Sequence, residues 1–406
     1  MATLTLSNLH EHLIPLPSWE EQLEAALQRL DPCLPRKQVR QQAKDYIKGL
    51  LSPVERKNGW QLAEHLGHPN PYRVQHLLDR AIWDAAKVRD DLTRYVIQHL
   101  GDPDGVVVLD ESGFPKKGEH SCGVKRQYSG AAGRVDNSQI GVFLGYASPK
   151  GHTLIDCELY LPKEWADDPK RRKKTQVPAD VAFATKPQLA QKMLERAFLA
   201  GLPMGFVTAD TVYGEDASLR ASLQARRQSY VLAVATDTRL SWEQGQIRAE
   251  TLTRRLPPSA WQPLSCGEGA KGPRLYDWAT LVLDAPAQEG FGHWLLARRS
   301  LSDATELAYY LVFAPLGTPL STMARVAGSR WTVEVGFENA KSEVGLDQYE
   351  VRSWHGWYRH MTLALFAQGL LTVLKKDHQE QTEKRGSYRT SPSLRSFKQS
   401  RGLLCP

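Results

Sequence analysis

The stretch GVVVLDESGFPKKG, residues 105–118, decides the fold of this chain. Four apolar, β-forming residues lead into Asp110, and a loop rich in Gly, Pro and Lys follows. A continuous apolar run of this length between turn residues is typical of a strand buried on both faces of a sheet. We expect that strand to end at Asp110. Because an unpaired buried carboxylate is costly, Asp110 either begins a turn at the solvent boundary or faces a cation.

A second short apolar run, GFVTAD at residues 205–210, ends in the same way at Asp210. The neighbouring patterns are strands at 140–146 and 153–161, helices at 186–200 and 217–227, and a strand at 230–235. The order strand, strand, strand, helix, strand, helix, strand is that of an RNase H-like α/β domain. Right-handed crossovers in this order bring the first and fourth strands side by side. The pattern therefore predicts that Asp110 and Asp210 lie at neighbouring strand ends.

Composition divides the rest of the chain. We expect a helical N-terminal DNA-binding domain (1–100), the first part of the core (101–236), a β-rich insertion (237–316), the C-terminal core helices (317–376) and a basic, disordered tail (377–406). In the first region, two helical patterns flank a His-Pro-Asn-Pro turn at residues 68–71. Such a pair either reads DNA as a helix-turn-helix or only packs as a helical hairpin.

The charge of the chain favours an anionic partner. The 406 residues carry a net charge of +7 and a pI of about 9.0, for which nucleic acid is the usual partner. The KRRKK run at 170–174, expected in a loop, either follows a DNA backbone or is only solvated. No apolar run has membrane-spanning length, and five scattered cysteines without a CxxC pair favour a reducing cytoplasm over a zinc site.

A third acid is expected from the segment RWTVEVGFENAKSEVGL, residues 330–346. Its charged residues recur at intervals of four, four and three, and so share one helix face: Arg330, Glu334, Glu338 and Lys341. The alternative is a solvated stripe of salt bridges. Together with Asp110 and Asp210, a carboxylate from this helix would complete a site for a hard divalent cation. Two such ions about 4 Å apart promote displacement at a phosphodiester.

At these residues the chain resembles insertion-sequence transposases of the DDE type, in the branch with a Tyr-x2-Arg-x3-Glu-x6-Lys signature. Arg330, Glu334 and Lys341 fit the last three positions, whereas Ala327 occupies the Tyr position. The segments LDESGFPKKG after residue 108, LYLPKEW at 159–165 and TADTVYGED at 208–216 also resemble this family. The resemblance covers roughly residues 20–375.

The resemblance implies a role for each matching residue. Asp110, Asp210 and Glu334 would be catalytic and hold Mg²⁺ or Mn²⁺, as two ions, with Glu338 as a supporting or alternative acid. Arg330 and Lys341 would contact DNA phosphate at the transposon end. From their positive charge we expect further phosphate contacts at Lys116 and Lys117 beside Asp110, and at the basic run: Lys170, Arg171, Arg172, Lys173 and Lys174. Trp261, Trp278 and Trp294 of the insertion either stack on an unpaired base or form its core.

Three other acids are set aside. Glu111 follows Asp110 directly and should point to the opposite side of the strand. Asp156 and Glu158 are expected on a strand away from the site, in solvent.

The expected function is that of a transposase. It would bind the terminal inverted repeats of an insertion sequence, cut the ends by metal-dependent hydrolysis and join the 3′-OH to target DNA. The expected partners are double-stranded DNA and a second protomer, in a cytoplasmic, nucleoid-associated complex. The alternatives are an RNase H-like endonuclease without strand joining and a non-catalytic DNA-binding repressor. Ala327 leaves the cleavage of the second strand open.

Overall fold

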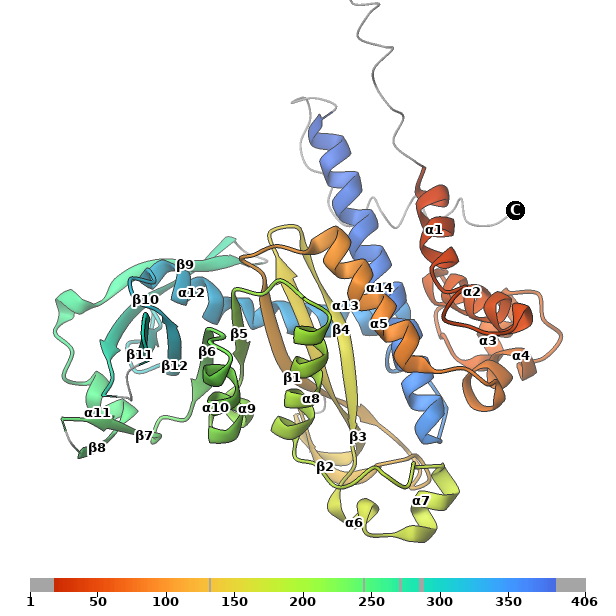
Figure 1. The fold of residues 1–406 in the computed structure, drawn as a ribbon, viewed down its shortest axis with the longest axis horizontal. Helices are drawn as coiled ribbons and strands as arrows, with labels where there is room; N and C mark the ends of the chain where they lie inside the picture. Colours follow the sequence, from red (N-terminus) through yellow and green to blue (C-terminus); the bar gives the residue numbers. More distant parts are fainter. Residues whose placement is uncertain (1–17, 131–132, 244, 270–271, 285–287, 385–406) are drawn as a thin grey trace, which may run out of the picture.

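The computed structural model describes residues 18–130, 133–243, 245–269, 272–284 and 288–384. A ten-stranded mixed sheet has the order β2-β3-β1-β5-β6-β12-β11-β10-β9, and β4 pairs with β3 on the edge opposite β1. Figure 1 shows α8 in front of this sheet and α13 behind it. None of the helices in the described ranges is long and apolar enough to cross a membrane.

The strands fall into a core group and an insertion group. The core strands are β1 (Val106–Pro115), β2 (Lys125–Ser129), β3 (Arg134–Ser148), β4 (Gly151–Tyr160), β5 (Phe206–Ala209) and β6 (Tyr230–Val234). The insertion strands are β7 (Arg239–Trp242), β8 (Gly245–Arg248), β9 (Gln262–Gly269), β10 (Gly272–Val282), β11 (Phe291–Arg299) and β12 (Leu307–Pro315). Strands β7 and β8 form a separate two-stranded sheet.

The helices surround the sheet. The N-terminal ones are α1 (Trp19–Gln28), α2 (Lys37–Leu51), α3 (Gly59–His65), α4 (Tyr72–Gln75), the π-helical η2 (His76–Arg80) and α5 (Ala85–Leu100). The central ones are α6 (Lys163–Ala166), α7 (Pro169–Thr175), α8 (Lys186–Leu199), α9 (Thr211–Gly214), α10 (Ala217–Ala225), α11 (Ala249–Thr253) and the 3₁₀ turn η4 (Pro258–Ala260). The last three are α12 (Leu320–Ser329), α13 (Trp331–Val344) and α14 (Trp354–Lys384).

The RNase H-like order predicted from the sequence is confirmed. Strand β1 pairs antiparallel with β3 and parallel with β5, which itself runs parallel to β6. The expectation that the first strand ends at Asp110 is wrong, because β1 continues to Pro115. The long β3 accounts for this, since it pairs with every residue of β1 as far as Pro115.

The β-rich insertion continues the same sheet. Its strand β12 pairs antiparallel with β6, and β11, β10 and β9 follow outward. Arg274 on β10 donates hydrogen bonds to the carbonyl oxygens of Cys266 and Gly328, at 3.3 and 3.2 Å. The insertion therefore contacts the C-terminal part of α12, immediately before α13.

The C-terminal helix α14 joins the N-terminal helices to the core. It packs against β4, α5 and α2. Its buried His360 donates from Nε2 to the carbonyl oxygen of Leu346 at 3.2 Å and accepts at Nδ1 from the hydroxyl of Tyr46 at 2.8 Å. Burial lowers the pKa of His360 to about 4, so the ring is neutral. The helix continues to Lys384. The predicted disorder from residue 377 onward is therefore wrong for residues 377–384. Residues 385–406 of the predicted tail lie outside the described residues.

Asp156 and Glu158 are not solvated, contrary to expectation. Asp156 is 4% exposed and its Oδ2 lies 2.8 Å from Nε of Arg196, while Oε1 of Glu158 lies 2.7 Å from Nη2 of the same arginine. The hydroxyl of Tyr358 on α14 donates to Glu158 at 2.8 Å. The prediction failed because β4 has α8 and α14 packed against it. These two acids belong to an internal network that joins α8 and α14 to the sheet.

Candidate active site

Asp110 lies where β5 stops pairing with β1. The parallel pairing ends at Leu109 opposite Ala209, and from Asp110 onward that edge of β1 has no β5 partner. The Oδ1 atom of Asp110 accepts a hydrogen bond from the backbone N–H of Glu111 at 2.8 Å. Its side chain is 15% exposed, so the carboxylate is largely buried.

Asp210 follows β5 directly and begins α9. It is the N-cap of that short helix, and its Oδ1 accepts from the N–H of Val212 at 2.9 Å. Since β1 and β5 run parallel and their pairing ends at Leu109 and Ala209, the next residue of each strand lies at the same level of the sheet. The structure thus brings Asp110 and Asp210 together, as the strand order predicted.

Glu111 completes the cluster that the structure shows. One carboxylate oxygen from each of Asp110, Glu111 and Asp210 lies within 4.8 Å of the other two, so Glu111 lies beside the site and not away from it as expected. Strand alternation does hold, because Asp110 faces Arg330 whereas Glu111 faces α8 and α9. Beyond the last residue of β5 no strand separates the two sides. Both carboxylates therefore approach Asp210.

Glu334 and Arg330 lie beside this cluster rather than in it. Nη1 of Arg330 is 3.6 Å from Oδ2 of Asp110, and its Nη2 is 2.9 Å from Oε1 of Glu334. The Glu334 side chain is 49% exposed and does not belong to the acidic cluster found among the described residues. Arg330 thus bridges the first and third acids that the sequence predicted.

The electrostatics of the cluster favour a cation. Burial, and then the charge of Asp210, raise the pKa of Asp110 to about 7. Burial and the charge of Glu111 raise the pKa of Asp210 as well. Both shifts mean that the charged carboxylates are unfavourable side by side without a positive partner. Oxygen ligands from several carboxylates are the donor set that Mg²⁺ and Mn²⁺ take, so these residues fit a divalent ion.

Two comparisons with known proteins agree with this site. A family model described as "DDE superfamily endonuclease" matches residues 29–273, which include Asp110 and Asp210 and end before Glu334. This chain belongs to the DDE endonuclease superfamily. It is also 28% identical, over 195 residues, to a probable transposase for insertion sequence element IS701 from Microchaete diplosiphon. That alignment covers 47% of this chain and 47% of the relative, so the chain spans about half the length of the curated protein it matches. The resemblance to DDE-type insertion-sequence transposases is thereby confirmed.

The cations that a DDE endonuclease would place on DNA differ in their surroundings. Lys117 is exposed, whereas Nζ of Lys116 lies 3.5 Å from the ring centroid of Tyr349. Burial lowers the pKa of Lys116 to about 8. Lys341 is half-buried, with Nζ 5.8 Å from the ring centroid of Phe114. Of the two lysines that follow β1, Lys117 is therefore more exposed to solvent than Lys116.

The KRRKK run lies on helix α7 and not in a loop. The signals for this helix were in the sequence, since Asp168 caps it and Pro169 is its first residue. Arg172 faces inward and donates to the carbonyl oxygens of Pro178 and Val181, both at 2.7 Å. The other four cations of the run are exposed: Lys170, Arg171, Lys173 and Lys174.

The tryptophans of the insertion differ in their burial. Trp278 is 0% exposed, so its stacking role is wrong. Trp261 is half-buried with the guanidinium of Arg299 4.2 Å from its ring centroid, and Trp294 packs against the core. Sequence reasoning missed Trp331, which is 37% exposed, follows Arg330 directly and stacks on Arg274 at 5.0 Å. Its position inside the signature segment was the available signal.

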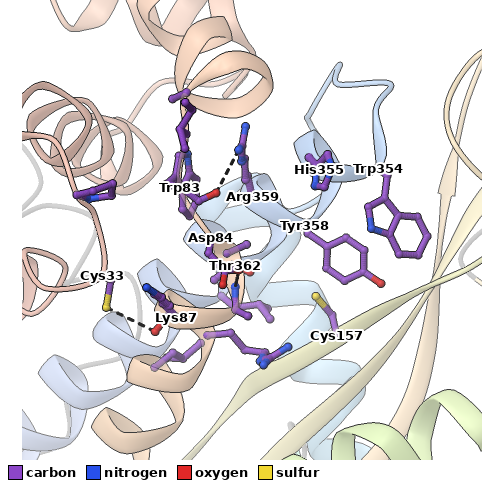
Figure 2. Close-up of a pocket in the computed structure, with 18 of the residues that line it drawn as sticks. Cys33, Trp83, Asp84, Lys87, Cys157, Trp354, His355, Tyr358, Arg359 and Thr362 are labelled. Atoms are coloured by element: carbon purple, nitrogen blue, oxygen red, sulfur yellow. Dashed lines mark hydrogen bonds between the residues drawn. The ribbon is translucent and has the colours of Figure 1, made fainter. Parts of the chain in front are cut away.

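One cleft of the protein is distinct from the acidic site. It has a volume of about 810 Å³ and lies between the N-terminal helices and the core. Figure 2 shows Trp83 and Lys87 on one side of it and Trp354 and Tyr358 on the other. None of the three clustered acids lines it.

Proposed function

We propose that this protein is a transposase that binds the ends of an insertion sequence, cuts them and joins the 3′-OH to target DNA. The observation that supports this most directly is the pair Asp110 and Asp210. Asp110 lies in β1 where its pairing with β5 stops, Asp210 follows β5, and a carboxylate oxygen of each lies within 4.8 Å of the other. Membership of the DDE endonuclease superfamily and the similarity to a probable transposase support the same reading.

Asp110, Asp210 and Glu334 would hold the divalent ions, Mg²⁺ or Mn²⁺, in the complex with DNA. Two such ions would activate the attacking oxygen and stabilise the leaving one. For Glu334 to join the other acids, Arg330 must leave its bridging position between them. A DNA phosphate is a suitable new partner for Arg330, since guanidinium binds phosphate through two parallel hydrogen bonds.

Several exposed groups would hold the DNA outside the active site. The α3–α4 hairpin carries two exposed aromatic side chains, Trp60 at 64% and Tyr72 at 70%. Exposed cations of α7 and Lys117 would contact the phosphate backbone, while Lys341 would contact it beside α13. We further propose that two protomers pair two DNA ends and that the complex acts on the chromosome in the cytoplasm.

A single reaction separates the proposed function from its alternatives. Purified protein, Mg²⁺, labelled element ends and a supercoiled plasmid are incubated together, and the labelled products are resolved on a gel. Transposase activity gives label joined to the plasmid. Cleaved ends without joined product would instead indicate an endonuclease, and binding without either product would indicate a repressor.

The third acid is tested by two matched substitutions on one helix face. Glu334→Gln should abolish cleavage, because it removes a charged oxygen ligand. Glu338→Gln, one turn further along and also exposed, should reduce it by no more than a few-fold. The opposite pattern would identify Glu338 as the third acid.

A further inference from the structure

Glu111 is held in place by two donors from different helices. Its Oε1 lies 2.5 Å from Nζ of Lys186, the first residue of α8, and its Oε2 accepts from the hydroxyl of Tyr213 on α9 at 2.7 Å. Tyr213 is 0% exposed and Lys186 is half-buried. A long side chain that would otherwise be mobile is therefore fixed beside Asp110 and Asp210.

The two donors leave Glu111 with capacity to bind a cation. A carboxylate has about four lone-pair positions, and Lys186 and Tyr213 occupy one on each oxygen. Oxygens around an octahedral ion with bonds of about 2.1 Å lie roughly 3–4.2 Å apart. The 4.8 Å within which the three carboxylates already lie is only slightly wider. Small side-chain rotations would let all three contact one ion.

Glu334 is not equally available in the protein without DNA. Its carboxylate is paired with Arg330 at 2.9 Å, and the same arginine lies between it and Asp110. A cation approaching Glu334 must displace a positive charge. A cation approaching Glu111 meets three carboxylates in one place, with Lys186 on the side facing α8.

We propose that, in the DNA-free protein, Glu111 is the third carboxylate that binds the divalent ion, together with Asp110 and Asp210. This inference rests on the proposed function, because it assigns a further ligand to the same metal site. Lys186 and Tyr213 are positioning residues, which hold the two oxygens of Glu111 toward the cluster. Glu334 binds only after Arg330 has moved to DNA.

The test is Mn²⁺ binding by the full-length protein without DNA, measured as the loss of the free-ion signal in electron paramagnetic resonance. Glu111→Gln should weaken binding by at least about tenfold, the lower bound for disturbing the surroundings of a metal site. Lys186→Met should weaken binding less than Glu111→Gln does, since it removes a positioning donor and, at the same time, a positive charge that competes with the ion. Glu306→Gln, at an exposed acid outside the acidic cluster, serves as the matched control and should bind like the wild type.

The double variant Glu111→Gln/Lys186→Met distinguishes ligation from charge balance. If Glu111 binds the ion, the double variant stays at least tenfold weaker than the wild type. If Glu111 only neutralises Lys186, removing both restores wild-type affinity, and the proposal is overturned. Thermal unfolding of each variant shows whether its fold is retained. If Glu111→Gln fails to fold, Glu111→Asp is measured in its place. It should bind more weakly because its shorter side chain keeps the charge but withdraws the oxygens.

Failure of this proposal is separable from failure of the proposed function. Asp110→Asn and Asp210→Asn are measured in the same experiment. If both lose Mn²⁺ while Glu111→Gln keeps it, Glu111 is not a ligand and the metal site stands. If neither loses Mn²⁺, the metal site and the proposed function fail together.

Discussion

Replacing Trp331 and Trp278 separately by alanine should give opposite defects. Trp331 is 37% exposed at the start of α13, beside Arg330, whereas Trp278 is 0% exposed in the sheet. We expect the exposed ring to stack on an unpaired base at a cut DNA end. Trp331→Ala should therefore weaken binding to such an end by about 1–3 kcal/mol, or about 5–150-fold. Its stability loss should be only about 0.5–1 kcal/mol, from the lost stacking on Arg274.

The buried tryptophan should behave in the reverse way. Trp278→Ala removes a fully enclosed indole and should cost about 3–5 kcal/mol of unfolding free energy. Binding of the unpaired end by the folded fraction should be unchanged. Affinities are measured by fluorescence of 2-aminopurine at the unpaired position, and stabilities by urea unfolding.

An end with an abasic residue at the unpaired position is the control, because it offers no ring to stack. On that end Trp331→Ala should bind like the wild type. Equal losses on the normal and the abasic end would refute the stacking role.

Three further predictions concern pH, the basic helix and the bridging arginine. His360 has a pKa of about 4 in the folded protein, whereas its ordinary value is 6.5. Below about pH 6.5 the unfolded chain therefore binds a proton at this residue more readily than the folded protein does. The resulting stability loss should reach about 2 kcal/mol at about pH 5 in urea unfolding, and His360→Gln should lack this component. Lys173→Ala/Lys174→Ala should lower the salt slope of DNA binding by about 2, whereas Arg172→Ala should destabilise the protein and leave that slope unchanged. Arg330→Gln should raise Mn²⁺ affinity without DNA yet reduce end cleavage; a lower Mn²⁺ affinity would argue against its bridging role.

The sequence was sufficient for the parts of the site that depend on strand order. Apolar runs ending at Asp110 and Asp210, together with right-handed crossovers, placed the two carboxylates at adjacent strand ends. In the structure the two carboxylates do lie close together, although β1 continues past Asp110 to Pro115. The helix that carries residues 170–174 could also have been predicted from the sequence, because Asp168 and Pro169 mark a helix start.

The remaining features depend on contacts between distant segments. Glu111 approaches the cluster because Lys186 and Tyr213, far along the chain, hold its oxygens. The burial of Trp278 depends on how β10 packs in the sheet. Neither the position of Glu111 nor the burial of Trp278 follows from local periodicity. Periodicity predicts the direction of a side chain but not the distant residues that it contacts.

The most direct test of the central claim is end cleavage by Asp210→Asn. The substitution keeps the shape of the side chain and an oxygen that can cap α9, while removing the charge. We expect cleavage of a labelled element end in Mg²⁺ to fall by at least about a thousandfold, equivalent to roughly 4 kcal/mol of metal-dependent stabilisation. Binding of the same end should stay within a few-fold of wild type. A variant that binds and still cuts at the wild-type rate would contradict a catalytic site built on Asp110 and Asp210.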